Sequence, residues 1–396
     1  MRARSPPAPG RCLLRAAARA GAGQAAERQR AGAGPAPGGR PAASATRPSG
    51  PGTCGGRRSR RRTRTGGGAR PGGGTGRGGR ARAGAGGEGE GGREAPREAA
   101  LRLLASPMGY VVGGVPIWVG SALAFAARKE FSALKLAAML AAAALTMGWL
   151  NLSNDVFDAE TGVDAEKVES VVARTGDPAA VFWLANLFLA LGAGIFAALV
   201  LWTGDLRVLA LLGGAVAVGY MYQGPPFRFS YRGWGEPMTV VAFAASTGAF
   251  YLIQAAASTL APARFTPTAV AACLLTGFNT ALILLASHFH QEATDREHGK
   301  RSPVVRLGTE AASLLLRALL CCVYVAQLAL ITAGVLPPET AATALSLGKA
   351  NAVYRQVTAF HHIPLRVKTL KFAVAKWHQA FGVCLAVGLA SSALFG

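Results

Sequence analysis

Two short stretches of this sequence hold most of its carboxylate side chains, and each one follows a long apolar segment. From residue 101 onward the chain has fifteen Asp and Glu, and eleven of them fall within 155–177 or 292–310. Ionisable side chains are costly inside a membrane and usually mark functional positions. We therefore expect the chemistry of this protein in these two stretches.

The first stretch places three oxygen-bearing side chains on one stripe of a helix. Asn151, Asp155 and Asp158 follow the spacing i, i+4, i+7, which aligns them along one helical face. Carboxylate and amide oxygens suit a hard cation, and Mg²⁺ typically combines one or two carboxylates with waters and substrate phosphates. The stripe therefore predicts a Mg²⁺ site.

The second stretch repeats the spacing with a different set of side chains. His288, then Gln291 or Glu292, and then Asp295 lie at the same intervals. Two oxygen-rich stripes that face each other would hold a cation between them. The alternative is that these carboxylates form a solvated helix end, or a proton or cation path through a transporter.

Basic side chains follow each stretch and favour one of these interpretations. Lys167 and Arg174 come after the first stripe, and Lys300, Arg301 and Arg306 come after the second. Carboxylates with a metal ion, surrounded by Lys and Arg, suit a polyphosphate better than a cation pathway.

The first hundred residues differ from the rest of the chain. Residues 1–100 contain 21 Arg, no Lys and five Glu, a net charge of +16 out of +22. Their Arg, Gly, Ala and Pro cannot bury a core, and an acid-poor, Arg-rich beginning is typical of an organelle transit peptide. An RNA-binding arm is the alternative, but the aromatic residues that stack on bases are missing, so we expect no nucleic-acid partner.

Residues 101–396 are expected to form an all-α membrane domain around a central cavity. A membrane-spanning helix needs about 20 mainly apolar residues, and a scan at that length predicts about nine. The predicted segments are 106–126, 132–154, 179–202, 205–223, 238–259, 267–290, 311–334, 340–361 and 371–395. Lys349 and Arg355 interrupt the eighth, which is the weakest of them.

This order of helices places both oxygen-rich stripes on one side of the membrane. Each stripe follows an even-numbered segment, and all even-numbered segments end on the same side. Most Lys and Arg of the connecting loops fall on that side too, which the positive-inside rule assigns to the cytosol-equivalent compartment. In a plastid that compartment is the stroma.

The motifs NDVFDAETGVD, from Asn154, and DREHGKRSPVVRLG, from Asp295, resemble the two Asp-rich motifs of the UbiA superfamily of intramembrane prenyltransferases. The resemblance covers essentially all of 101–396. The stretches SHFHQ, YMYQGPPFRFSYRGWGE and ESVVART are similar to the 1,4-dihydroxy-2-naphthoate branch, in particular to its phytyltransferases. In one place the sequence departs from the wider family, because Gln291 stands where the second motif usually begins with Asp.

The resemblance implies a reaction and a role for each residue of the motifs. A polyprenyl diphosphate ionises, and an electron-rich aromatic carbon captures the allylic cation. It implies Mg²⁺ held by Asp155, Asp158, Asp295 and Glu292, with Asn151, Asn154 and Gln291 beside it, and diphosphate oxygens held by Lys167, Arg174 and Lys300.

Aromatic and imidazole side chains near the motifs have two interpretations each. Tyr220 and Tyr222 could contact the cation or the diphosphate, and aromatic residues are equally common at a membrane interface for other reasons. His288 and His290 could position the aromatic substrate or accept a proton, although a histidine at a helix end is more often only hydrogen-bonded.

These expectations combine into one predicted function. The chain would transfer a phytyl group from its diphosphate to 1,4-dihydroxy-2-naphthoate in a chloroplast membrane, with loss of the carboxylate, in phylloquinone synthesis. The alternatives are prenyl transfer to homogentisate and, from another class of protein, a membrane transporter.

Overall fold

The computed structural model describes residues 107–161, 170–256 and 262–395. The predicted transit peptide and Lys167 lie outside these residues. The elements are α3 (Pro107–Arg128), α4 (Ala133–Thr161), α5 (Val171–Thr175), α6 (Pro178–Thr203), α7 (Leu206–Gln223), η1 (Phe229–Arg232), α8 (Gly235–Ala255), α9 (Pro267–Glu297), α10 (Pro303–Thr332), η2 (Pro338–Ser346), α11 (Leu347–Phe360), α12 (Pro364–Val367) and α13 (Leu370–Phe395). The described part of the chain is helical and has no strand, as the sequence predicts.

Local sequence sets where the long helices begin and end. Asp177 and Thr266 cap α6 and α9, because each side-chain oxygen accepts a hydrogen bond from a backbone N–H of the first turn. Pro178 and Pro267 follow them at the first helical position, where the missing N–H has no cost. Gly204 ends α6 with a φ of 66°, a left-handed conformation that favours glycine.

Seven of the described helices are long and apolar enough to cross a membrane: α4, α6, α7, α8, α9, α10 and the segment Pro364–Leu394. The structure therefore confirms a polytopic helical bundle but does not confirm the count of nine. The apolar helical stretch of α3, Val112–Arg128, is shorter than these seven helices. The predicted segment 340–361 divides into a 3-10 helix and the fourteen-residue α11.

α9 lies at the centre of the packing. In its most apolar 18 residues 72% of the residues are buried, against 17–33% in the corresponding parts of α4, α6, α7 and α10. Helices α8, α10 and α13 pack against it, α3 packs on α8 and α13, and α4 packs on α6. Trp377 and Phe381 of α13 are the largest fully buried side chains.

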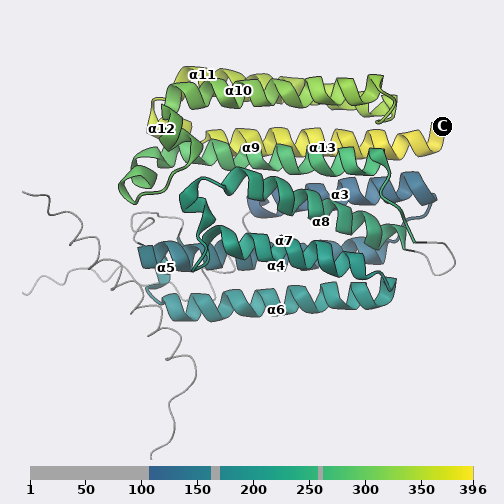
Figure 1. Cartoon of the computed structure of the whole chain (residues 1–396), viewed down its shortest axis with the longest axis horizontal. Helices are drawn as coiled ribbons and strands as arrows, with labels where there is room; N and C mark the ends of the chain where they lie inside the picture. The colour runs from purple at the N-terminus through teal and green to yellow at the C-terminus, as the bar shows by residue number, and fades with distance from the viewer. Residues whose placement is uncertain (1–106, 162–169, 257–261, 396) are drawn as a thin grey trace, which may run out of the picture. The chain divides into compact units, whose positions relative to one another are not determined.

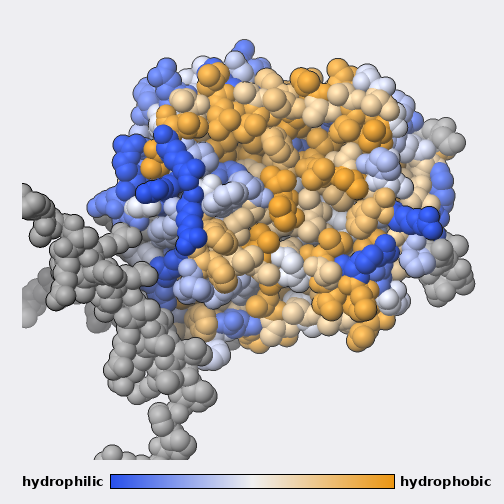
Figure 2. Space-filling model, viewed as in Figure 1, coloured by the Kyte–Doolittle hydropathy of each residue, from blue (hydrophilic) through white to orange (hydrophobic). Residues whose placement is uncertain are grey.

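The outer helices expose large apolar side chains on the outside of the bundle. Leu201, Leu206 and Leu328, from α6, α7 and α10, are 84%, 74% and 62% exposed. Figure 2 shows an apolar surface across this face, with hydrophilic residues toward its two ends. Apolar surface in this arrangement suits a bilayer rather than water.

Both oxygen-rich stripes lie at the same end of the bundle, as the order of helices predicts. In Figure 1 the ends of α4 and α9 lie on the left, together with α5 and α12. Both helices run further than their predicted segments, to Thr161 and Glu297. The residues of both stripes are therefore helical, so each set of side chains lies along one face of its helix.

Candidate active site

The last turns of α4 bring the first stripe to a cavity of about 470 Å³. Asn151, Asn154, Asp155 and Asp158 all line it. The helical spacing of the sequence places these side chains on one wall, so the structure brings together every member of the first predicted stripe.

Polar side chains from five other places complete the lining. They are Tyr222 and Gln223 at the end of α7, Thr239 on α8, Thr280, Ser287, His288, His290 and Gln291 on α9, Lys300 after α9, and Lys371 on α13. Deeper in the bundle the lining is apolar and includes Met147, Leu150, Phe243 and Ile283. The cavity thus has a polar end near the membrane surface and an apolar part that can hold a hydrocarbon chain.

Asp155 is fixed by the backbone that follows the first motif. Its Oδ2 atom accepts a hydrogen bond of 2.8 Å from the backbone N–H of Val171, the first residue of α5. A carboxylate that accepts a backbone hydrogen bond keeps its orientation. Asp155 is therefore held with its side chain on the cavity wall.

Asp158 is buried and is held by a residue that the sequence analysis did not identify. Gln223 donates a hydrogen bond from Nε2 to Oδ1 of Asp158. Its own Oε1 accepts a hydrogen bond of 2.7 Å from the hydroxyl of Ser230, on η1. This chain of contacts connects α4 to the loop after α7. Asp158 and Gln223 are 65 residues apart, so no local sequence pattern indicates that they are in contact.

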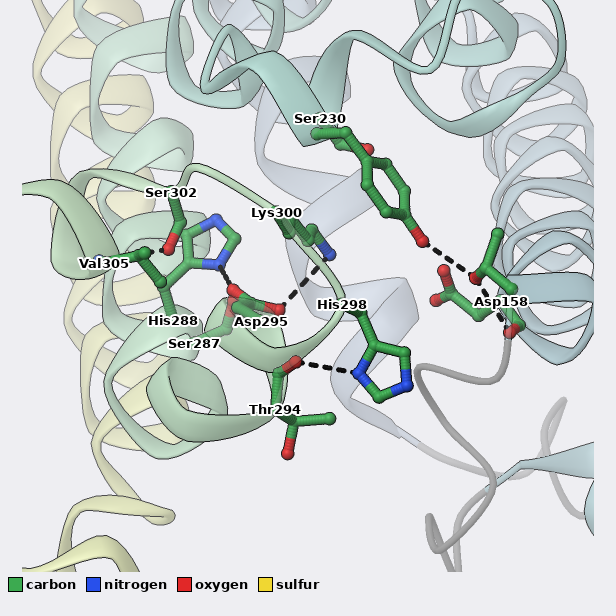
Figure 3. A network of polar contacts seen from close by, with 12 residues as sticks. Asp158, Ser230, Ser287, His288, Thr294, Asp295, His298, Lys300, Ser302 and Val305 are labelled. Atoms are coloured by element: carbon green, nitrogen blue, oxygen red, sulfur yellow. Dashed lines mark hydrogen bonds and ion pairs between the residues drawn. The ribbon is translucent and has the colours of Figure 1, made fainter. Parts of the chain in front are cut away.

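Asp295 is fully buried between two basic side chains. Its Oδ2 lies 3.1 Å from Nδ1 of His288, and its Oδ1 lies 3.7 Å from Nζ of Lys300. Figure 3 shows Asp295 between His288 and Lys300, with Asp158 on the other side of the view. A buried carboxylate needs such partners, because an unpaired charge away from water is costly.

The turn after α9 places Lys300 next to Asp295. Gly299 has a φ of 73°, which reverses the chain at low steric cost. The backbone N–H of Lys300 then donates a hydrogen bond of 2.8 Å to the carbonyl oxygen of Asp295. The sequence GK after the second motif therefore sets the position of a cationic side chain at the cavity.

Glu236 is a second acidic partner of His288. It lies in the first turn of α8, and its Oε1 is 3.6 Å from Nε2 of His288. Oε1 is buried and accepts no hydrogen bond from a described residue. Glu236 is one of only four carboxylates from residue 101 onward outside the two acidic stretches. Its isolated position at the start of a helix is the sequence signal that could have marked it as a site residue.

Asp295 itself is not among the residues that line the cavity, and three further predicted residues also lie away from the lining. Tyr220 donates a hydrogen bond of 2.7 Å to the carbonyl oxygen of Pro225. Glu292 pairs with Arg296 one turn later on α9. Arg174 lies in the last turn of α5, so its predicted role depends on reaching the cavity from there.

Tyr231 bridges the two motifs. Its hydroxyl lies 2.8 Å from the hydroxyl of Thr161 at the end of α4, and its ring centroid lies 5.8 Å from Nζ of Lys300. Thr161 also donates to a backbone carbonyl of α4, so Tyr231 acts as donor to Thr161. Burial raises the pKa of Tyr231, which keeps its hydroxyl protonated at neutral pH.

The first stripe has the donors that a Mg²⁺ ion bound together with a diphosphate requires. Among the described residues, no group of three or more His, Cys, Asp or Glu could hold a metal ion unaided. Mg²⁺ needs no such group when substrate phosphates and waters complete its shell. Asp155, Asp158 and the amides of Asn151 and Asn154 fit this role, whereas the oxygens of Asp295 already face His288 and Lys300.

The chain belongs to the UbiA prenyltransferase family, whose model matches residues 114–394. It is 37% identical over 299 residues to the chloroplastic 2-carboxy-1,4-naphthoquinone phytyltransferase of Arabidopsis thaliana, covering 75% of this chain and 78% of that one. It is 38% identical over 299 residues to the 2-carboxy-1,4-naphthoquinone phytyltransferase of Synechocystis, covering 74% and 94%. A solved UbiA homolog from Archaeoglobus fulgidus bound to GPP and Mg²⁺ is similar with a TM-score of 0.46 and 17% identity, covering 72% of this chain and 99% of that chain.

Proposed function

We propose that this chain transfers a phytyl group from phytyl diphosphate to 1,4-dihydroxy-2-naphthoate, with release of CO₂ and diphosphate, in a chloroplast membrane. One observation carries the proposal. A single cavity joins a carboxylate stripe, two lysines and an apolar interior, in a chain similar to two phytyltransferases whose names give a 2-carboxy-1,4-naphthoquinone as acceptor. The dihydroxy form is the reduced partner of that quinone, and its electron-rich ring suits attack on a cation.

Asp155 and Asp158, with Asn151 and Asn154 on the same stripe, would hold Mg²⁺ at the diphosphate. When bound, the ion stabilises the negative charge that grows on the leaving diphosphate. The protein places these side chains at the polar end of the cavity, so the prenyl chain extends from them into the apolar part. This arrangement sets the allylic carbon between the two regions.

Cationic side chains at the same end would stabilise the departing diphosphate. Lys300 is 6% exposed and lines the cavity beside Asp295. Its charge acts more strongly here than in water, because fewer solvent molecules screen it. Arg174 and Lys167 remain further proposed contacts of the diphosphate oxygens.

The bonding changes balance without an added reactant. The bond between the allylic carbon and the diphosphate oxygen breaks, and its electron pair leaves with the diphosphate. The ring carbon that bears the carboxylate then bonds to the allylic cation. The bond to the carboxylate breaks next, its electron pair restores the aromatic ring, and CO₂ departs. Water must be kept from the cation meanwhile, and the apolar lining provides that protection.

The product formed from a set of substrates tests this function. Purified protein in liposomes would receive phytyl or geranylgeranyl diphosphate together with dihydroxynaphthoate or homogentisate, and products would be identified by mass. We expect phytyl-dihydroxynaphthalene lacking the carboxyl group. A product from homogentisate alone would instead support the alternative acceptor, and no product from any pair would contradict prenyl transfer.

A further inference from the structure

The wall of the cavity at α13 differs in chemistry from the wall at α4. Lys371 and Phe372, in the first turn of α13, both line the cavity and are both half-buried. The α4 wall presents Asp155 and Asp158 instead. α3 packs against both α4 and α13, and Figure 1 shows α13 and α4 in different layers of the bundle. The cavity is therefore acidic along one side and has a cation beside an aromatic ring along another.

Lys371 and Phe372 lie close together and favour one class of ligand. Nζ of Lys371 lies 5.1 Å from the centroid of the Phe372 ring. An ammonium group attracts a carboxylate, and an aromatic ring favours stacked or edge-on contact with another aromatic ring. A ligand with a carboxylate attached directly to a ring satisfies both groups at once.

A diphosphate matches this wall less well. Its proposed partners are the carboxylate stripe on α4, which would hold a divalent cation, and Lys300, which lies beside Asp295. A phosphate group gains nothing from the ring of Phe372. An aryl carboxylate placed here would stand across the cavity from the diphosphate, which is the arrangement that prenyl transfer requires.

We propose that Lys371 and Phe372 form the binding site of the aromatic acceptor, in which Lys371 pairs with its ring carboxylate and Phe372 contacts its fused rings. This inference rests on the proposed function and names the residues that select a carboxylated acceptor. Because the carboxylate leaves as CO₂, the ion pair with Lys371 exists in the bound substrate and is lost during the reaction. Its contribution therefore falls on substrate binding more than on turnover.

Two unreactive analogues separate this role from others. 2-Naphthoate and naphthalene-2-carboxamide have nearly the same shape, and only the first carries a charge. For the wild-type protein we expect 2-naphthoate to inhibit competitively against the acceptor, about tenfold or more tightly than the amide. Equal inhibition by the two analogues would overturn the proposal without any variant.

Variants of Lys371 then assign the preference to one side chain. We expect Lys371→Met to reduce the preference to near one and to raise the KM for dihydroxynaphthoate about tenfold. The KM for phytyl diphosphate should stay the same, and Lys371→Arg should restore the preference. A rise in the KM for the diphosphate, or an unchanged preference, would contradict the proposal.

Two further variants and the wild-type activity complete the test. Lys371→Gln gives a second neutral variant in case Lys371→Met does not insert into the membrane, and Phe372→Leu should weaken binding of both analogues equally. A wild-type protein that prenylates no carboxylated naphthalene would contradict the proposed function itself. A wild-type protein that prenylates dihydroxynaphthoate while Lys371→Met keeps its preference would contradict this inference alone.

Discussion

At the scale of single residues, the site depends on side chains that hold the motif carboxylates in place. Asp155 is held by the N–H of Val171, Asp158 by Gln223, and Asp295 by His288 and Lys300. Each of these three carboxylates has at least one partner outside its own helix. A prenyltransferase site must keep acidic groups oriented before substrate arrives, and these contacts provide that order.

Gln223→Met tests whether the support of Asp158 matters for the reaction. The change keeps the side-chain length but removes the donor, so Asp158 loses a buried hydrogen bond. We expect prenyl transfer to fall about tenfold, with a higher Mg²⁺ concentration needed for half-maximal rate. Gln356→Met, which removes a hydrogen bond to Thr369 at a half-buried position of α11 outside the cavity lining, is the matched control and should leave both values unchanged.

Gln291→Asp tests the unusual residue of the second motif. Gln291 lines the cavity, so an added carboxylate raises the negative charge near the diphosphate. We expect the Mg²⁺ titration of activity to move without loss of the activity itself. A titration identical to that of the wild type would place Gln291 away from the metal.

Only part of the site could be predicted at this scale. The spacing of Asn151, Asp155 and Asp158 was enough to place them on one wall, because a helical stripe depends on sequence distance alone. The partner of Asp158 lies 65 residues away, and Glu236 lies 52 residues before His288. Such contacts depend on how the helices pack, which local sequence does not determine.

At the scale of elements, the site rests on close contact between α8 and α9. α8 carries Glu236 and Thr239, and α9 carries His288 and Asp295. A Cβ atom at Gly277 would overlap the carbonyl oxygen of Val240 and lie 3.0 Å from the backbone nitrogen of Ala244. Small residues let helix backbones approach in a membrane, and Gly277 has this role.

Gly277→Ala should therefore separate α8 from α9. The backbone of α8 cannot move aside as a flexible side chain does, so we expect a loss of about 1–3 kcal/mol in stability. The measurement is thermal unfolding of the purified protein in detergent. Gly213→Ala, on α7 where an added Cβ meets nothing within 4 Å, should unfold at the wild-type temperature or slightly above.

Most helices could be predicted from apolar length, and the exceptions have physical causes. α4 and α9 continue beyond their apolar segments, because the polar residues that follow contain no Pro or Gly to interrupt the helix before Thr161 and Glu297. The segment 340–361 is not one long α-helix. Pro338 starts a 3-10 helix that runs to Ser346, and α11 follows with Lys349 and Arg355 on exposed positions.

At the scale of the whole molecule, the two motifs share one end of the bundle because an even number of membrane-length helices, α6, α7, α8 and α9, separates the end of α4 from the end of α9. Arg366 belongs to α12, which lies at the same end, and Arg264 comes just before the start of α9, at the opposite end of that helix from the second motif. Both side chains are exposed. The proposed orientation places the end with the motifs toward the stroma, as the positive-inside rule favours.

Cysteine labelling tests that topology. In a variant without native cysteines, Arg366→Cys and Arg264→Cys would be labelled with a membrane-impermeant maleimide in sealed thylakoid vesicles whose stromal side faces outward. We expect labelling of Arg366→Cys before lysis and of Arg264→Cys only after it. The reverse pattern would place the motifs on the lumenal side, and equal labelling of both would contradict the transmembrane arrangement.

The balance of products measures the central claim most directly. Purified protein with phytyl diphosphate and dihydroxynaphthoate labelled in its carboxyl group should release one CO₂ and one diphosphate for each phytyl group transferred. Asp155→Asn should lower that rate about 10²–10³-fold in a folded protein, while Asp177→Asn, which keeps the cap of α6, should match the wild type. Full turnover by Asp155→Asn, or a prenylated product that keeps its carboxylate, would contradict the account.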